Sequence, residues 1–366
     1  MPKRDTPFTY ADHLQLDRLL SCQARQSEKH GRPAHDEMLF VIVHQAYELW
    51  FKLILFELDR IQAVFSGPTA DDRSLGEAVQ GVIRIVEIQK LLIHQLDVLE
   101  TMTPLDFLDF RDLLVPASGF QSVQFRLIET RLGLRPAERI AFDGRPYDAR
   151  LRPGDRAALR AAAARRSLCD QIERWLERTP FVNVAGYDFR EVYRQAVTEM
   201  LESEATLVRE NPALSKAEIE AELASLTASR DRFDSILDEA RHRSLQAQGI
   251  WRLSAQALQA ALFINLYRNE PALQLPFALL SGLMDIDQTL TNWRYRHALM
   301  VQRMIGRKVG TGGSSGHEYL RQTAEKHRVF GDLFALSTFF IPRSRLPDLP
   351  EAIRRAMGYR YAKVGA

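Results

Sequence analysis

The sequence predicts an all-α fold, and three observations support this. Apolar residues recur at helical spacing through most of the 366 residues. No strand-period segment of any length is visible, and long stretches such as 35–58 contain neither proline nor glycine. Because 46% of the residues are apolar, the chain can bury one large core or two moderate ones.

Composition limits the classes of function. The net charge of +2 gives no electrostatic footprint for a nucleic acid or a membrane surface, so we expect neither partner. The first residues show no signal-peptide pattern, and no apolar run approaches the roughly 20 residues that span a bilayer. Cys22 and Cys169 lie far apart, which argues against a zinc site or a disulfide framework. We therefore expect a soluble, cytoplasmic protein.

The first expected helices follow from leucine spacing and helix-end signals. Residues 10–28 form an amphipathic pattern, and the loop at 29–33 leads to the N-cap chemistry of His35-Asp36-Glu37. The long apolar helix that begins there ends near Ser66-Gly67-Pro68. A second long helix is expected over 70–100, where valine, isoleucine and leucine form the apolar stripe.

Shorter and more polar helices follow. Thr103-Pro104 opens a helix at 105–114, and Pro116–Gly119 separates it from another at 120–132. Residues 133–153 look irregular, and a helix at 154–178 ends at Thr179-Pro180. The helices at 188–209 and 215–247, split by Asn211-Pro212, have alternating Glu and Arg and predict an exposed hairpin. Apolar helices return at 254–267, 274–305, from Glu318 and at 328–341, and residues after Pro342 look peripheral.

Two histidines fall on apolar helix faces. Phe40, His44 and Glu48 form one stripe of the 35–66 helix, and His297 shares a stripe with Trp293 and Met300. Each histidine could be a core residue bonded to a carbonyl or carboxylate, or a polar group that orients a ligand in an apolar pocket. The sequence does not show whether the two meet.

An arginine and a glycine-rich segment are further candidates. Arg111 lies among Phe107, Phe110 and two leucines. It could snorkel, pair with a neighbouring aspartate, or bind a ligand carboxylate. Residues 309–316 hold four glycines around Thr311 but lack the lysine of a P-loop. This segment is either a plain linker, an anion-binding loop or a mobile lid.

Five motifs in this order resemble the tryptophan 2,3-dioxygenase family, and more closely its longer form with an inserted helical hairpin. They are His35-Asp-Glu with Phe40 and His44-Gln-Ala-Tyr-Glu-Leu-Trp-Phe-Lys52, Asp109-Phe-Arg-Asp112, Pro116-Ala-Ser-Gly-Phe-Gln-Ser122, Trp293-Arg-Tyr-Arg-His297 and Gly310-Thr-Gly-Gly-Ser-Ser-Gly316.

The resemblance implies a helical bundle that encloses haem b, ferrous for activity, and a homotetramer that is a dimer of dimers. It implies dioxygenation of L-tryptophan by O2 to N-formyl-L-kynurenine, the first step of tryptophan catabolism by the kynurenine pathway. The implied haem- and substrate-binding core is 35–132 with 250–345, the inserted region is 133–249, and 346–366 is a peripheral tail. Residues 1–34 would complete a neighbouring subunit's site.

The resemblance also implies a role for individual residues. His297 would be the axial ligand of the haem iron, with Ser118 and Gly119 beside the haem. His44 would be the catalytic residue that accepts a hydrogen bond from the indole N–H. The remaining substrate contacts would come from Phe40, Val41, Ile42, Val43, Phe107, Arg111 and Thr311, and from Tyr10 and His13 of the neighbouring subunit.

The N-terminal motif departs from the family. Where the family usually has Tyr-Gly-x-Tyr-Leu, this chain has Tyr10-Ala11-Asp12-His13-Leu14. The alternatives are therefore a related haem monooxygenase that acts on L-tryptophan or a methylated tryptophan, and a non-catalytic haem-binding or sensor protein. A purely structural helical scaffold is a further alternative, which haem uptake would exclude.

Overall fold

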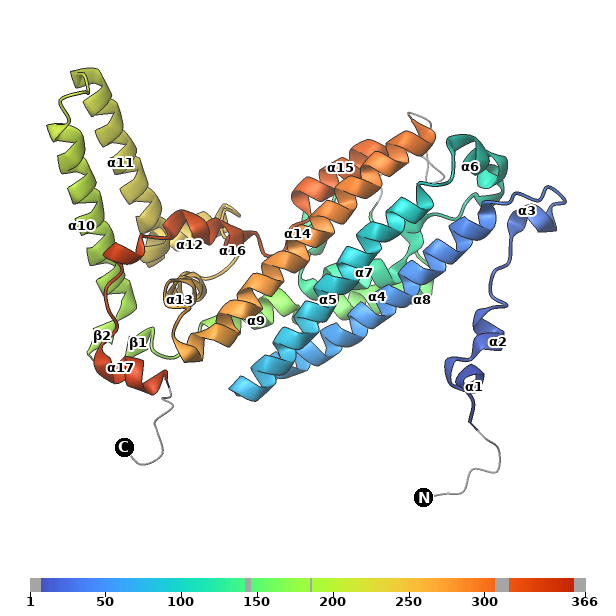
Figure 1. Cartoon of the computed structure of the whole chain (residues 1–366), viewed down its shortest axis with the longest axis horizontal. Coiled ribbons are helices and arrows are strands. Elements are labelled where there is room, and N and C mark those ends of the chain that lie inside the picture. Colours follow the sequence, from blue (N-terminus) through green and yellow to red (C-terminus); the bar gives the residue numbers. More distant parts are fainter. Residues whose placement is uncertain (1–7, 142–145, 185, 307–315, 359–366) are drawn as a thin grey trace, which may run out of the picture.

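A computed structural model describes residues 8–141, 146–184, 186–306 and 316–358 of the chain, and it confirms the all-α fold (Figure 1). The α-helices are α1 (Tyr10–Leu14), α2 (Leu16–Leu19), α3 (Gln26–Lys29), α4 (Glu37–Ser66), α5 (Asp72–Leu99), α6 (Pro104–Arg111), α7 (Val123–Leu132), α8 (Pro153–Ala163), α9 (Leu168–Leu176), α10 (Phe189–Glu210), α11 (Lys216–Leu237), α12 (Glu239–Ala247), α13 (Ala255–Leu266), α14 (Pro271–Ile305), α15 (Gly316–Lys326), α16 (Gly331–Ala335) and α17 (Glu351–Ala356). Short 3-10 turns are η1 (Asp112–Leu114), η2 (Gly119–Gln121), η3 (Pro136–Glu138), η4 (Leu336–Phe339) and η5 (Arg343–Arg345). Within the described ranges the only strands are β1 (Asn183–Val184) and β2 (Tyr187–Asp188), which pair antiparallel with Asn183 opposite Asp188.

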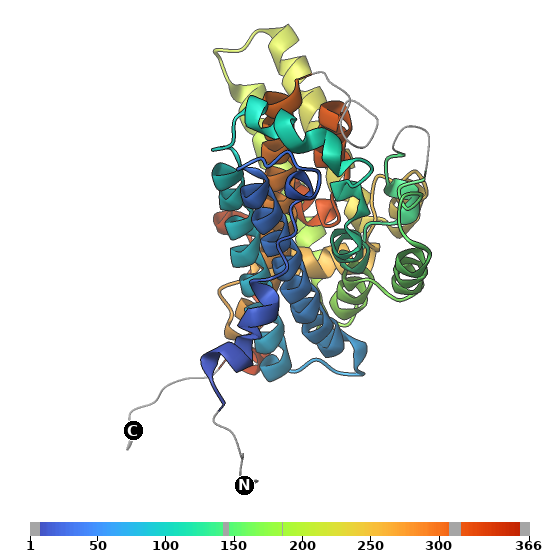
Figure 2. The same cartoon turned by 90° about the vertical axis from the view of Figure 1, so that its right-hand side faces the viewer.

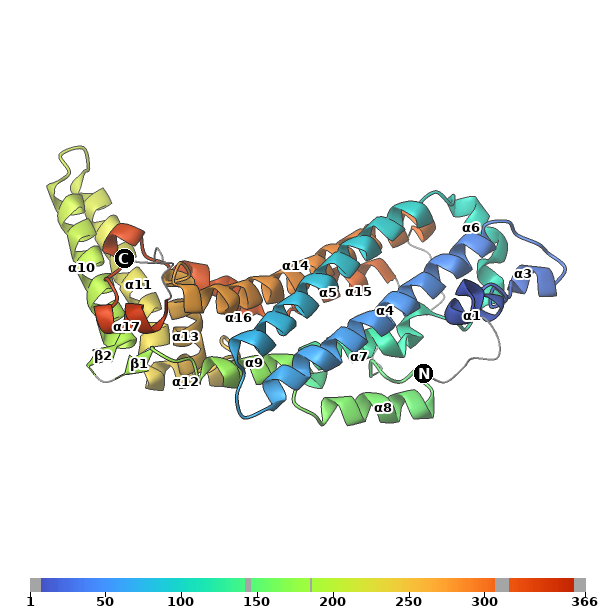
Figure 3. The same ribbon diagram turned by 60° about the horizontal axis from the view of Figure 1, so that its bottom comes forward.

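Three long helices, α4, α5 and α14, run side by side and form the frame of the molecule (Figures 1 and 3). Small residues let α5 approach both of its neighbours. A Cβ at Gly81 would lie 2.9 Å from Ile61 on α4, and a Cβ at Gly282 on α14 would overlap Val82. Glycine at these two positions therefore allows the close packing on which the frame depends.

A second helical unit extends this frame. The α10–α11 hairpin projects from the body, as the alternating charges at 188–247 predicted (Figures 1 and 3). Its base is apolar, because Phe189 packs on both Tyr193 and Phe263 of α13, and Phe189 and Tyr193 are almost fully buried. The N-terminal helices α1 and α2 bury no residue and leave the bundle at its lower edge in Figure 2 (dark blue).

Three expected helices are interrupted, and capping residues or an unusual backbone explain each break. The 10–28 helix is broken at Gln15, whose φ of 53° is left-handed. Ser167 caps a new helix, α9, within 154–178, and Asp238 caps α12 within 215–247. A serine or aspartate side chain that accepts a backbone N–H stabilises a helix start, and the pattern of apolar residues alone does not reveal this.

Two further segments differ from the sequence-based expectation. Residues 346–358, assigned above to a peripheral tail, include the buried side chains Leu349, Ile353 and Met357 beside the start of α14. Helix α4 is long and apolar enough to cross a membrane by length and composition alone, although the sequence analysis found no such segment. Because α4 packs lengthwise on α5 and carries Glu48 and Glu57, we interpret it as a core helix.

Candidate active site

One cavity of about 330 Å³ lies where α4, α5, α6, α7, α14 and α15 meet. Its walls are mostly apolar, and a few polar side chains converge on it, which is typical of small-molecule and cofactor sites. The lining residues are Phe40, His44, Tyr47, Glu48 and Phe51 of α4; Leu96, Leu99 and Met102 at the end of α5; Phe107 and Arg111 of α6; Ser118–Phe120, Ser122, Phe125, Arg126 and Glu129 around α7; Trp293, Arg294, His297, Met300, Val301, Met304 and Ile305 of α14; and Tyr319, Leu320, Thr323 and His327 at α15.

His44 faces this cavity as a hydrogen-bond acceptor. Its Nδ1–H donates to the carbonyl oxygen of Phe40 at 2.7 Å, because a carbonyl can only accept. Burial lowers the pKa of His44, although the Phe40 carbonyl and the Glu48 carboxylate oppose this effect. The imidazole is therefore neutral near pH 7, and its Nε2 lone pair is available to a ligand N–H.

Aromatic rings line the cavity beside His44. The Phe40 ring lies 4.0 Å from the His44 ring and 5.8 Å from that of Phe107, centroid to centroid, and Phe110 contacts both phenylalanines edge-on. Arg111 follows Phe107 by four residues on α6, so both side chains lie on the same face and border the cavity. This part of the site can hold a planar apolar group and place a guanidinium near one end of it.

His297 lies in the same cavity, which answers the question that the sequence left open. Its Nδ1 is buried and has no partner among the described residues, so Nε2 is the nitrogen accessible from the cavity. Burial lowers the pKa of His297 to about 4, and the nearby His44 acts in the same direction. A neutral imidazole with an accessible Nε2 can bind a metal ion.

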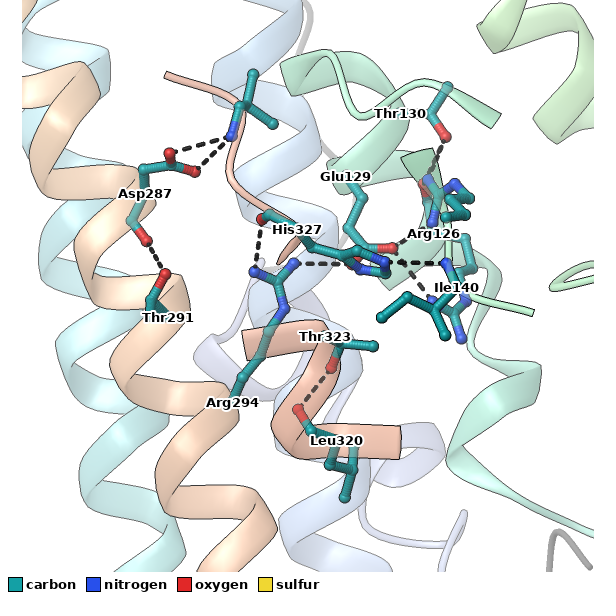
Figure 4. A network of polar contacts seen from close by, with 12 residues as sticks. Arg126, Glu129, Thr130, Ile140, Asp287, Thr291, Arg294, Leu320, Thr323 and His327 are labelled. Carbon is teal, nitrogen blue, oxygen red and sulfur yellow. Dashed lines mark hydrogen bonds and ion pairs between the residues drawn. The ribbon is translucent and has the colours of Figure 1, made fainter. Parts of the chain in front are cut away.

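A cluster of buried charges, which we call the arginine hub, borders the cavity, and Figure 4 shows its polar contacts. It consists of Arg126, Glu129, Arg139, Arg294 and His327. The Glu129 carboxylate accepts hydrogen bonds from Arg126 at 3.2 Å, from Arg294 at 2.8 Å and from Arg139. Burial alone would raise the pKa of Glu129, but the arginines and His327 lower it well below the usual range.

The arginine hub also joins distant parts of the chain. His327 Nε2 accepts the backbone N–H of Ile140, and Arg294 donates to the His327 carbonyl at 3.0 Å (Figure 4). Since burial lowers the pKa of His327, this residue is neutral. Three arginines and one carboxylate then leave a formal charge of +2 beside the cavity, which is suited to a ligand with anionic groups.

Most of the site residues predicted from the sequence meet at this cavity. Its lining includes Phe40, His44, Phe107, Arg111, Ser118, Gly119 and His297. Thr311 lies outside the described residues. Tyr10 is 74% exposed, and neither it nor His13 borders the cavity of its own chain.

The expectation that Val41, Ile42 and Val43 continue the lining needs correction. None of the three borders this cavity. Successive residues of a helix point about 100° apart, so residues between Phe40 and His44 must face elsewhere. Val43 accordingly packs in the core, while Ile42 is 49% exposed.

Sequence reasoning missed Tyr47 and the arginine hub. Arg126, Glu129 and Thr130 form a polar stripe on α7, a pattern that normally marks the solvent-facing side of a helix. All three are buried here. The only local signal was that Arg294 and Tyr47 belong to motifs already singled out for their histidines.

Two comparisons with known proteins point to one family. A family profile described as "Tryptophan 2,3-dioxygenase" matches residues 3–340. The chain is 50% identical over 355 residues to the tryptophan 2,3-dioxygenase of Bdellovibrio bacteriovorus, covering 97% of this chain and 99% of the relative. It is 47% identical to that of Alteromonas mediterranea, with 98% and 99% covered, and 44% identical to that of Dictyostelium discoideum, with 96% and 88% covered.

Proposed function

Since the chain belongs to the tryptophan 2,3-dioxygenase family, we propose that it converts L-tryptophan and O2 to N-formyl-L-kynurenine. In this reaction the indole C2–C3 bond breaks, and each carbon receives one oxygen atom. Both atoms of O2 enter the product, so the overall reaction needs no external electrons.

The cavity residues fit haem b. His297 would bind the iron through Nε2, and the apolar walls, with Ser118 and Gly119 at their edge, would surround the macrocycle. The formal +2 charge of the arginine hub would balance the two haem propionates. Two residues of the hub, Arg126 and Arg294, border the cavity, and Arg126 also donates a hydrogen bond to Tyr319. Ferrous haem supplies the activation of O2.

The protein's own contribution is to position the substrate. The indole would lie between the aromatic walls, with its N–H donated to His44 Nε2, which is free because Nδ1–H is held by the Phe40 carbonyl. Arg111 would bind the carboxylate in a charge-assisted pair, and the Thr311 hydroxyl would assist at the same end.

We propose that the active form is a homotetramer, a dimer of dimers. Ile42, Leu49 and Phe56 are seven residues apart on α4 and 49%, 53% and 67% exposed, and Ile83, Leu91 and Val98 are similarly exposed on neighbouring α5. Apolar stripes of this extent on adjacent helices support burial against other subunits. Helix α1, which exposes Tyr10 and buries nothing in its own chain, would reach the neighbouring site with His13.

We also propose a cytoplasmic location. Cys22 and Cys169 are both free thiols, and Cys22 is exposed, which is typical of proteins in a reducing compartment.

One observation carries the proposed function: His44, Arg111 and His297 face a single cavity. The test is single-turnover mass spectrometry of the product formed from reduced, haem-loaded protein, L-tryptophan and ¹⁸O2. Two labelled oxygens in a ring-opened product are expected. One labelled oxygen on an intact bicyclic product would instead identify a monooxygenase, and failure to take up haem would exclude both activities.

A further inference from the structure

We propose that Tyr47 and Trp293 are positioning residues that fix the ring plane of His297. This inference rests on the proposed role of His297 as an iron ligand. An iron-bound imidazole usually has its second nitrogen hydrogen-bonded to a carboxylate, carbonyl or water, which sets the ring orientation. Among the described residues, Nδ1 of His297 has no such partner. Within the described ranges, the contacts that orient this ring are therefore ring contacts rather than hydrogen bonds.

The Trp293 side chain is in contact with the His297 ring. It precedes His297 by four residues on α14, and the two rings are stacked with centroids 5.2 Å apart and planes only 11° apart. A parallel arrangement of this kind restricts the imidazole torsion, because rotation of the imidazole would drive it into the indole face. The plane of His297 is therefore as well defined as that of Trp293.

Tyr47 holds Trp293 in turn. The indole N–H of Trp293 donates to the Tyr47 hydroxyl at 3.3 Å, and the Tyr47 hydroxyl donates to the carbonyl oxygen of Leu92 at 2.5 Å. Both directions are unambiguous, since an indole N–H cannot accept and a carbonyl cannot donate. Burial raises the pKa of Tyr47 to about 12, so the hydroxyl keeps its proton.

These contacts join three helices. Tyr47 lies on α4, Leu92 on α5 and Trp293 on α14, and Phe125 of α7 packs on the indole at 5.3 Å. The indole is thus held from several sides by rigid elements. The indole N–H of Trp293 donates to Tyr47 and the hydroxyl of Tyr47 to Leu92, so this chain of hydrogen bonds includes neither Arg111 nor a residue of the arginine hub.

The test uses the haem-loaded full chain with Tyr47→Phe and Trp293→Phe. Tyr267→Phe is the matched control, because Tyr267 is also buried and donates to a backbone carbonyl, that of Pro347 at 2.8 Å, but lies outside the cavity lining. The measurements are the iron–histidine stretching band of the ferrous protein by resonance Raman spectroscopy and the rate of haem transfer to apomyoglobin.

We expect Tyr47→Phe and Trp293→Phe to shift and broaden the iron–histidine band and to speed haem loss by about tenfold, the lower end of the effect of losing a residue that orients a metal ligand. Tyr267→Phe should keep the wild-type band. The positioning role is overturned if both variants keep the wild-type band, or if Tyr267→Phe shifts it equally. If His297→Ala retains the band, or the wild type binds no haem, the ligand assignment itself fails and this proposal fails with it.

Discussion

Replacing Glu129 by glutamine tests whether the arginine hub is held together by its single carboxylate. The side chain keeps its size but loses its charge, so Arg126, Arg139 and Arg294 stay buried and lose the carboxylate that they share. Glu129 is only 2% exposed, so water cannot replace the lost interaction. Removing one partner of a buried ion pair typically destabilises a protein by about 3–5 kcal/mol.

This value converts to a measurable change in melting temperature. With an unfolding entropy of about 2.1 cal/mol/K per residue, the 366-residue chain changes by about 0.8 kcal/mol/K. The Tm of Glu129→Gln should therefore fall by about 4–6 °C in differential scanning calorimetry of the haem-free protein at pH 7.

The pH dependence has a definite sign. Because the folded-state pKa of Glu129 is lowered, its stabilisation is present above the unfolded-state pKa and is lost as pH falls through the folded value. The Tm difference between wild type and Glu129→Gln should therefore be constant from pH 7 to 5 and shrink only below the ordinary Glu pKa of about 4.3.

A surface variant is the matched control. Glu351 is ion-paired with Arg354 and Arg355 on the exposed side of α17, and Glu351→Gln should leave the Tm within experimental error. An equal effect of the two substitutions, or an unchanged Tm in Glu129→Gln, would refute the view that the buried carboxylate organises the hub.

Three further predictions concern the site and the assembly. Arg111→Ala should lower kcat/KM for L-tryptophan by about 10- to 150-fold, mainly through KM, because a charged hydrogen bond contributes about 1.5–3 kcal/mol; haem absorbance should be unchanged, and loss of haem would contradict the assignment. Because the pKa of His44 is lowered, its neutral form persists on acidification, so kcat/KM should begin to fall only below the ordinary His pKa of about 6.5; a fall that begins above pH 6.5 in steady-state assays would contradict this. Phe56→Glu should reduce the oligomeric mass in analytical ultracentrifugation, since Phe56 is 67% exposed within one chain, whereas Glu77→Gln on the exposed side of α5 should not.

The sequence was informative where helix period and residue type agree. The stripe of Phe40, His44 and Glu48 predicted which side of α4 faces a ligand, and the cavity lies on that side. The second stripe, with Trp293 and His297, was equally well predicted. In both cases the helical repeat alone determines which side chains point together.

Prediction failed where tertiary contacts reverse a local pattern. The polar stripe of α7 should face solvent by its period, yet Arg126 and Glu129 are buried because α14 supplies Arg294 opposite them. The sequence of α7 alone does not predict Arg294 as a partner, because Arg294 lies 165 residues from Glu129 in the chain. The expectation that Ile42 lines the pocket, which came from the family resemblance, failed for a different reason. Successive residues of a helix point about 100° apart, so three residues in a row do not all face one cavity.

One turn of α14 links the arginine hub to His297. Trp293, Arg294 and His297 lie within five residues. The Trp293 indole is hydrogen-bonded to α4 and the Arg294 guanidinium to α7, while the His297 imidazole faces the cavity. A shift of this turn cannot move one of the three without the others, since all share the same helical backbone. Weakening the arginine hub at Glu129 should therefore disturb the orientation of His297 as well as stability, because the Glu129 carboxylate bonds to the arginines of the hub.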